Sequence, residues 1–266
     1  MALWHLILLA LVQGVTEFLP VSSSAHLILV PRLTGIADQG VALDVALHIG
    51  TLGAVVLYFR ADVARALSGT AGLFRKRWGP DERLAAGLAI ATVPVVLAGL
   101  VLKVTGTADL LRSVEVIGWA TVLFGALLWW FDKRGTQTRD LGDWTPGQAL
   151  KFGLWQAIAL IPGTSRSGIC ITGARAMGYG REDAARIAML MSIPTILASG
   201  ALLSLDVFGQ TDGQLLRDAG IAALMAFVAA LAALALMMRL LRSVSFTPYV
   251  VYRMMLGAFL LGWVYL

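Results

Sequence analysis

The chain has 266 residues, of which 58% are apolar and 14% charged, and its formal net charge is +5. An average soluble domain is about 45–50% apolar and about 25% charged, so a single water-soluble core would leave too little polar surface here. The composition therefore predicts an integral membrane protein. It excludes a secreted disulfide scaffold, a nucleic-acid binder and a typical cytosolic enzyme. Because Cys170 is the only cysteine, no intrachain disulfide can form.

The apolar segments fall into two similar series along the chain. A broken apolar region at 3–31 precedes three long apolar segments, and a second broken region at 148–178 precedes three more. At about 1.5 Å per helical residue, each long segment can cross about 30 Å of hydrocarbon. These six predicted spans are 41–59, 84–103, 113–131, 183–205, 219–241 and 248–266.

Both broken regions contain a polar, proline-containing interruption. Their second arms, 21–31 and 167–178, are too short to cross a bilayer. We therefore expect each region to form a re-entrant helix–loop–helix hairpin, which enters and leaves the membrane on the same side. The predicted fold is an all-α polytopic membrane protein with six transmembrane helices and two re-entrant hairpins.

The distribution of basic residues supports this topology. If neither hairpin crosses the membrane, 15 basic residues lie on one side and four on the other. The positive-inside rule assigns the side with 15 to the cytoplasm and the side with four to the outside. The first set is Arg60, Arg65, Arg75, Lys76, Arg77, Arg83, Lys133, Arg134, Arg139, Lys151, Arg175, Arg181, Arg186, Arg239 and Arg242, and the second is Arg32, Lys103, Arg112 and Arg217. We therefore expect both termini and the opening of the first hairpin on the outer face.

The order of a hairpin and three spans occurs twice, and three is odd, so the second copy must be inverted relative to the first. We expect a single integral membrane domain, 1–266, built from approximate inverted repeats 1–131 and 148–266. Inverted repeats with broken helices place polar sites near the middle of a membrane.

The first break carries ionisable groups that are costly inside a membrane and are therefore functional candidates. Gln13 and Glu17 share one helix face, and Pro20 ends that arm. A serine at the start of the next arm is a natural N-cap. If Ser23 is the cap, His26 lies at the same helix end, so that carboxylate, hydroxyl and imidazole converge.

The second break has the composition of a phosphate site. Arg166 is the only charge there, Thr164, Ser165 and Ser167 supply hydroxyls, and Gly163 permits close backbone approach. Helix N-termini and a bidentate arginine both favour phosphate. Two such N-termini, brought together by an inverted repeat, would cradle a diphosphate.

The motif from Gln13 to His26 resembles a signature of the bacitracin-resistance type undecaprenyl-diphosphatases. Pro162-Gly163-Thr164-Ser165-Arg166-Ser167-Gly168, followed by Thr172, resembles their second signature. The resemblance implies a bacterial inner-membrane hydrolase that converts undecaprenyl diphosphate to undecaprenyl phosphate, with Glu17, Ser23, His26 and Arg166 as the catalytic residues. Other motif residues are expected to bind the substrate, namely Gln13, Ser22, Ser24, Gly163, Thr164, Ser165, Ser167 and Thr172.

The resemblance also implies a divalent cation, Mg²⁺ or Ca²⁺, with Glu17 as its candidate ligand. Many relatives have a glutamate where this chain has Gln13, which leaves one carboxylate fewer. The expected partners are the polyprenyl diphosphate and membrane lipid, with no nucleic acid, and a homo-oligomer stays open.

Two mechanisms and two other functions stay open at this stage. Ser23, activated by Glu17, attacks the terminal phosphorus while His26 handles a proton, or His26 is itself the nucleophile. His48 and Asp44 either line the site or have a pairing or capping role. A lipid transporter would use the same architecture, and a non-catalytic scaffold would leave the buried charges unexplained.

Overall fold

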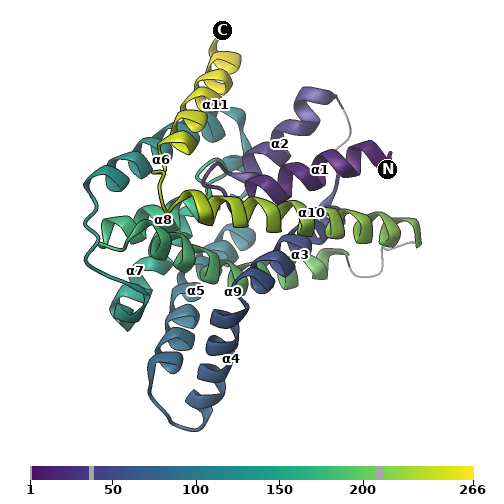
Figure 1. The fold of residues 1–266 in the computed structure, drawn as a ribbon. Coiled ribbons are helices and arrows are strands. Elements are labelled where there is room, and N and C mark those ends of the chain that lie inside the picture. Colours follow the sequence, from purple (N-terminus) through teal and green to yellow (C-terminus); the bar gives the residue numbers. More distant parts are fainter. Residues whose placement is uncertain (1, 36–38, 208–212) are drawn as a thin grey trace.

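The computed structural model describes residues 2–35, 39–207 and 213–266, and this described part is predominantly helical, without a β-strand. Figure 1 shows the arrangement of its helices. The α-helices are α1 (Leu3–Thr16), α2 (Ser23–Thr34), α3 (Val41–Tyr58), α4 (Arg60–Phe74), α5 (Pro80–Thr105), α6 (Val114–Arg134), α7 (Pro146–Ala157), α8 (Arg166–Ala176), α9 (Arg181–Val207), α10 (Gly213–Leu240) and α11 (Thr247–Tyr265). Short 3-10 helices are η1 (Asp109–Arg112), η2 (Leu141–Asp143) and η3 (Ile158–Leu160).

Five of the six predicted spans are helices that are long and apolar enough to cross a membrane. They are α3, α5, α6, α9 over Arg181–Leu203, and α10. The sixth, α11, is a helix of 19 residues but is not among these five. It carries Arg253 and three tyrosines, which make it less apolar.

Both predicted breaks are present. The first apolar region divides into α1 and α2, and the second into α7, η3 and α8. At about 1.5 Å per residue, none of the four α-helices reaches across a bilayer alone. The re-entrant arrangement of these arms, and the side of the membrane from which each enters, stay predictions.

The sequence prediction did not include α4, which lies in a region expected to be a cytoplasmic loop. In Figure 1 α4 and the first half of α5 extend together below the other helices. Gly69 of α4 lies against the backbone of Asp81, and Arg65 donates a hydrogen bond to the Asp81 carboxylate at 2.9 Å. The charged residues that suggested a loop therefore join two helices.

Helix α10 runs across the middle of the molecule, beside α1 and α3 (Figure 1). Small residues make these contacts close, as in other helix pairs in membranes. Gly14 of α1 lies against Ala226, Ala229 and Ala230, and Gly50 of α3 lies against the Ala223 carbonyl.

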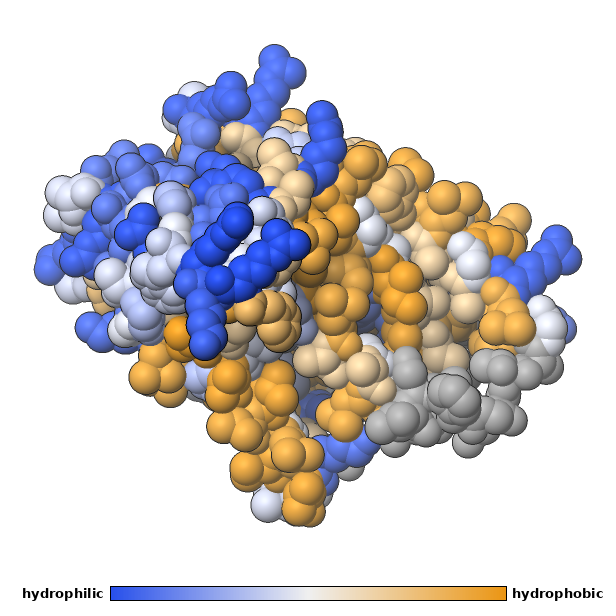
Figure 2. Space-filling view, turned by 90° about the horizontal axis from the view of Figure 1, so that it is seen from below, coloured by the Kyte–Doolittle hydropathy of each residue, from blue (hydrophilic) through white to orange (hydrophobic). Residues whose placement is uncertain are grey.

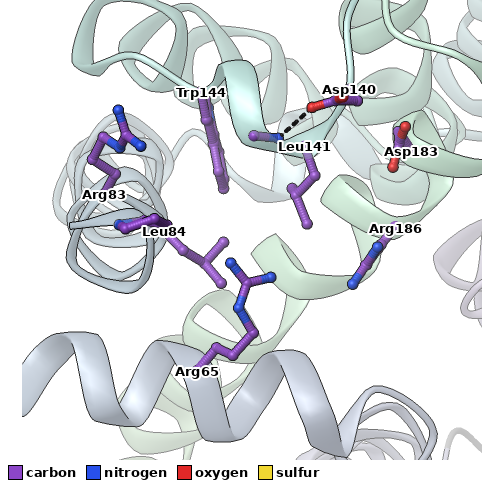
Figure 3. Close-up of a pocket in the computed structure, with 10 residues that line it drawn as sticks. Arg65, Arg83, Leu84, Asp140, Leu141, Trp144, Asp183 and Arg186 are labelled. Atoms are coloured by element: carbon purple, nitrogen blue, oxygen red, sulfur yellow. Dashed lines mark hydrogen bonds between the residues drawn. The ribbon is translucent and has the colours of Figure 1, made fainter.

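Three of the regions predicted to be cytoplasmic meet at one end of the molecule. Side chains from three of them, Arg65 and Arg83, Asp140, and Asp183 and Arg186, line one cavity of about 470 Å³ (Figure 3). Figure 2 shows a hydrophilic end of the molecule beside a broad hydrophobic surface. The side of the membrane on which this end lies stays a prediction.

Exposed apolar side chains continue along the outer faces of the long helices. On α5 they include Val93, Leu97, Val101 and Val104, which are 52–79% exposed. Apolar exposure on this scale is unfavourable in water and suits contact with lipid.

The contact between α3 and α10 leads to a stability prediction. A Cβ atom on Gly50 would lie 2.1 Å from the Ala223 carbonyl oxygen. We expect Gly50→Ala to destabilise the protein by about 1–3 kcal/mol, because the two helices must move apart. Thermal unfolding in detergent measures this. Gly220→Ala on α10 is the control, since no atom lies within 4 Å of its added Cβ, and equal melting temperatures for the two variants would contradict the prediction.

Candidate functional site

The two breaks share an unusual backbone geometry. Ser22 is the N-cap of α2 with a φ of 77°, and Ser165 is the N-cap of α8 with a φ of 70°. Their hydroxyl oxygens accept hydrogen bonds from the backbone N–H groups of Ala25 at 3.4 Å and Gly168 at 3.1 Å. A positive φ in a residue other than glycine costs about 1–3 kcal/mol and is typical of functional sites.

The cap of α2 is therefore Ser22 rather than Ser23. Ser23 is the first residue of α2, and Arg166 is the first residue of α8. Because its hydroxyl does not cap the helix, Ser23 Oγ is available for another partner.

That partner is Glu17, on which both breaks converge. Glu17 Oε2 accepts hydrogen bonds from Ser23 Oγ at 2.6 Å and from Gln13 Nε2 at 3.0 Å. Glu17 Oε1 accepts one from Arg166 Nη2 at 2.8 Å. The Glu17 side chain is only 6% exposed, so this carboxylate is stabilised by neighbours rather than by water.

Free backbone N–H groups lie at the start of both helices, whose first residues line one cavity with Glu17. Those of Ser23, Ser24, Arg166 and Ser167 begin the two helices and have no hydrogen-bond partner among the described residues. The first N–H groups of a helix carry partial positive charge and bind anions. Two helix N-termini and one arginine thus point to a ligand with phosphate-like charge.

A cavity of about 260 Å³ lies against these groups. Its polar lining comes from both breaks, from α3 and from α9, and its apolar lining comes from α5, η3 and α9. The lining residues are Glu17, Ser22, Ser23, Ser24, His48, Val95, Ala159, Leu160, Ser165, Arg166, Thr195, Ile196 and Ser199. Such a lining suits a ligand with an ionic head and an apolar tail.

His48 is the histidine that lines this cavity. Its Nε2 lies 3.9 Å from Glu17 Oε2, and its Nδ1 donates a hydrogen bond to the Asp44 carbonyl at 2.7 Å. His48 also lines a neighbouring cavity of about 270 Å³, together with Gln39, Asp44 and Arg112. The sequence left the role of His48 open between lining the site and a pairing role, and the structure shows both.

His26 lies outside the cavity lining. Its Nδ1 is 2.7 Å from the Ser22 carbonyl oxygen, and its Nε2 is 2.5 Å from the Tyr252 hydroxyl. The two rings are stacked with centroids 5.8 Å apart. His26 therefore contacts the strained turn at Ser22 rather than the Glu17 carboxylate.

The other predicted residues surround the site at different depths. Ser22, Ser24 and Ser165 line the cavity, whereas Ser167 donates a hydrogen bond to the Leu19 carbonyl at 3.0 Å, across the two breaks. Three further predicted residues do not line it. Thr172 bonds to its own helix, Thr164 Oγ1 is buried without a partner in the described part of the chain, and the Gly163 carbonyl accepts from Arg253.

Sequence reasoning missed Thr195 and Ser199, which bring α9 to the cavity. Both hydroxyls donate hydrogen bonds to carbonyls of their own helix, at 2.9 and 3.2 Å. Polar residues four apart on one helix face were the available signal.

Residues 6–259 match the protein family described as bacitracin resistance protein BacA. The chain belongs to this family. A Ruegeria pomeroyi protein named undecaprenyl-diphosphatase is 64% identical over 269 residues, which cover 100% of both chains. Proteins of the same name from Dinoroseobacter shibae and Saccharophagus degradans are 63% and 43% identical, with 98% and 99% of both chains covered. The resemblance based on the two motifs is thereby confirmed.

The residues at this family site do not fit a metal ion held by the protein. Among the described residues, no group of three or more His, Cys, Asp and Glu side chains could hold one. Glu17 is the only carboxylate in the cavity lining, and both of its oxygens accept protein hydrogen bonds. Gln13 Oε1 is buried without a partner in the described structure, but one neutral oxygen falls short of the several that a divalent cation requires.

The ion pair between Glu17 and Arg166 leads to a second stability prediction. Glu17→Gln and Arg166→Gln each leave one buried charge unpaired, and we expect each to destabilise the protein by about 3–5 kcal/mol. The double variant leaves no such charge, so we expect a loss smaller than the sum of the single losses by about 1–3 kcal/mol. Unfolding measured on the four proteins tests this, and additive losses would contradict it.

Proposed function

We propose that this protein removes the terminal phosphate of undecaprenyl diphosphate and releases undecaprenyl phosphate and inorganic phosphate. The observation that carries the proposal is the meeting of Glu17, Ser23 and Arg166 beside two helix N-termini whose first two N–H groups are free. Relatives named for this activity, identical at up to 64% over the full length, support it. The reaction recycles the lipid carrier for cell-wall polymers and removes the target of bacitracin.

The lining of the cavity suits this substrate. Arg166 and the free N–H groups of α2 and α8 bind the diphosphate, since they supply donors and positive charge. Val95, Leu160 and Ile196 line the same cavity and contact the first carbons of the polyprenyl chain. The hydroxyls of Ser24 and Ser165 add donors for the phosphate oxygens.

The first chemical step transfers the terminal phosphoryl group to Ser23. Its Oγ attacks the terminal phosphorus and gives its proton to Glu17 Oε2, with which it already forms a hydrogen bond of 2.6 Å. The bond from that phosphorus to the bridging oxygen breaks, and the lipid monophosphate leaves. Arg166 and the helix N-termini stabilise the negative charge on the transferred group.

The second step releases inorganic phosphate. Water attacks the phosphorus, the bond to Ser23 Oγ breaks, and Oγ recovers the proton from Glu17. One proton of the water stays on the attacking oxygen, and the other passes to another oxygen of the released phosphate. His48 Nε2, which faces Glu17 at 3.9 Å, hydrogen-bonds the phosphate oxygens when it is protonated.

A divalent cation would accompany the substrate in this scheme, because the diphosphate offers the oxygen ligands that the protein lacks. No step is assigned to the cation.

We also propose that the site opens to the outer face of the bacterial inner membrane, with both termini on that face. Arg65, Arg83 and Arg186 line a second cavity that shares no residue with the lining of the site. This basic grouping supports the orientation, since basic loops are enriched on the cytoplasmic side. The matching caps at Ser22 and Ser165 support an inverted repeat.

Removing either charge of the central pair tests the function. We expect Arg166→Ala and Glu17→Ala to lower phosphate release by about 100-fold or more, because each loses transition-state stabilisation or proton transfer. Release is measured from detergent-solubilised polyprenyl diphosphate, where no gradient exists and a pure transporter would release none. Arg83→Ala is the control, because this exposed arginine lies in the other cavity (Figure 3). Full activity in both site variants would refute the proposal.

The identity of the nucleophile is tested by trapping the phosphoenzyme. Because Ser23 contacts Glu17 and His26 contacts Tyr252, we expect quenched turnover to yield phosphoserine at Ser23. His26→Ala should still form it, whereas Ser23→Ala should form no phosphoenzyme. Phosphohistidine at His26 would show that the assignment is wrong.

A further inference from the structure

Arg253 of α11 is a fully buried arginine outside the site described above. Its exposed fraction is 0%, and no carboxylate lies within ion-pair distance of it among the described residues. Burying a guanidinium is costly unless its donors are satisfied. Here four backbone carbonyl oxygens accept the hydrogen bonds of the guanidinium.

Two of the four carbonyls belong to the two breaks. Arg253 Nη1 donates to the Pro20 carbonyl at 3.4 Å, and Nη2 donates to the Gly163 carbonyl at 3.1 Å. The other two, at 3.1 and 3.4 Å, are the Thr121 and Ala120 carbonyls of α6. One planar side chain thus ties both breaks to the same helix.

The held carbonyls are close in sequence to the proposed catalytic groups. Pro20 follows Glu17 by three residues, and Gly163 precedes Arg166 by three. The distance between the two carbonyls therefore affects the distance between Glu17 and Arg166, which is 2.8 Å. A second bond across the breaks, from Ser167 Oγ to the Leu19 carbonyl, acts in the same place.

Two glycines, Gly125 and Gly168, lie close to the Arg253 side chain. A Cβ atom on Gly168 would lie 3.0 Å from its Nη1, and one on Gly125 would lie 3.2 Å from its Nε. The guanidinium is closely surrounded, and its bonds to Thr121 and Ala120 anchor it on α6, outside both breaks. A group anchored on a third segment can set the spacing between the two breaks.

We propose that Arg253 is a positioning residue that sets the relative placement of the two broken helices, and so of Glu17 and Arg166, without contacting the substrate. The inference rests on the proposed function, because a misplaced Arg253 is expected to change the rate of phosphate release. Misplacing reacting groups by about 1 Å lowers rates by about 100-fold.

The test compares Arg253→Met with Arg175→Met, in kcat and KM per folded molecule. Arg175 is a matched control, because it is also buried and donates to four backbone carbonyls. These are the carbonyls of Asp132, Gly135, Thr136 and Tyr179, which belong to the end of α6 and to the loops that follow α6 and α8 rather than to the turns at the breaks. We expect Arg253→Met to lower kcat by about 100-fold with KM changed less than about threefold. Arg175→Met should lower the melting temperature and leave kcat within about twofold.

Arg253→Lys and Ser167→Ala keep the test decisive if Arg253→Met does not fold. Lysine keeps the charge but cannot reach both breaks with one planar fork, so its kcat should fall between those of the wild type and Arg253→Met. When Arg253→Lys is combined with Ser167→Ala, the effects of the two substitutions on kcat should be non-additive, because both side chains hold the same distance between the two breaks.

A kcat within about twofold of wild type for Arg253→Lys and Arg253→Met would overturn the proposal, as would strictly additive effects with Ser167→Ala. A wild-type protein that releases no phosphate would instead overturn the proposed function, so the two failures are distinguishable.

Discussion

The ion pair between Glu17 and Arg166 is the interaction on which the rest of the site depends. A carboxylate that is only 6% exposed needs compensation, and Arg166, Ser23 and Gln13 supply it from both breaks. Each break can approach the other only because its helix stops there. A continuous helix would satisfy its own N–H groups and leave none for a ligand. The broken helices are thus a requirement of the buried charge, not an irregularity.

The same N-cap geometry serves a different chemical purpose at each break. At both breaks a serine with positive φ caps the second arm, so the next residue begins a helix beside the cavity. At α2 that residue is Ser23, a nucleophile in the proposed mechanism. At α8 it is Arg166, a cation. Equivalent positions therefore bring a hydroxyl and a positive charge to opposite oxygens of Glu17.

Composition and spacing predicted the long apolar helices and both breaks, and the inverted repeat predicted that the two breaks meet, because these follow from apolar length and from the cost of burying charge. Local spacing could not select Ser22 as the cap, since three consecutive serines are chemically equal and the choice depends on φ. Nor could it prefer His48 over His26, because the face that α3 turns to the cavity is set by its packing on α10. The charges of α4 were taken for a loop because their partner, Asp81, lies on the next helix.

The bonds across the breaks also bear on the choice between an enzyme and a lipid transporter. A transporter with this architecture must move one repeat against the other to open its site to each side in turn. Here Glu17 with Arg166, Ser167 with the Leu19 carbonyl, and Arg253 with both breaks join the two halves at the site itself. Moving the halves apart would leave several buried polar groups unpaired at once, each at a cost of about 1–3 kcal/mol. Groups held in one arrangement suit transition-state stabilisation, which depends on preorganised charges, and so favour hydrolysis at a fixed site.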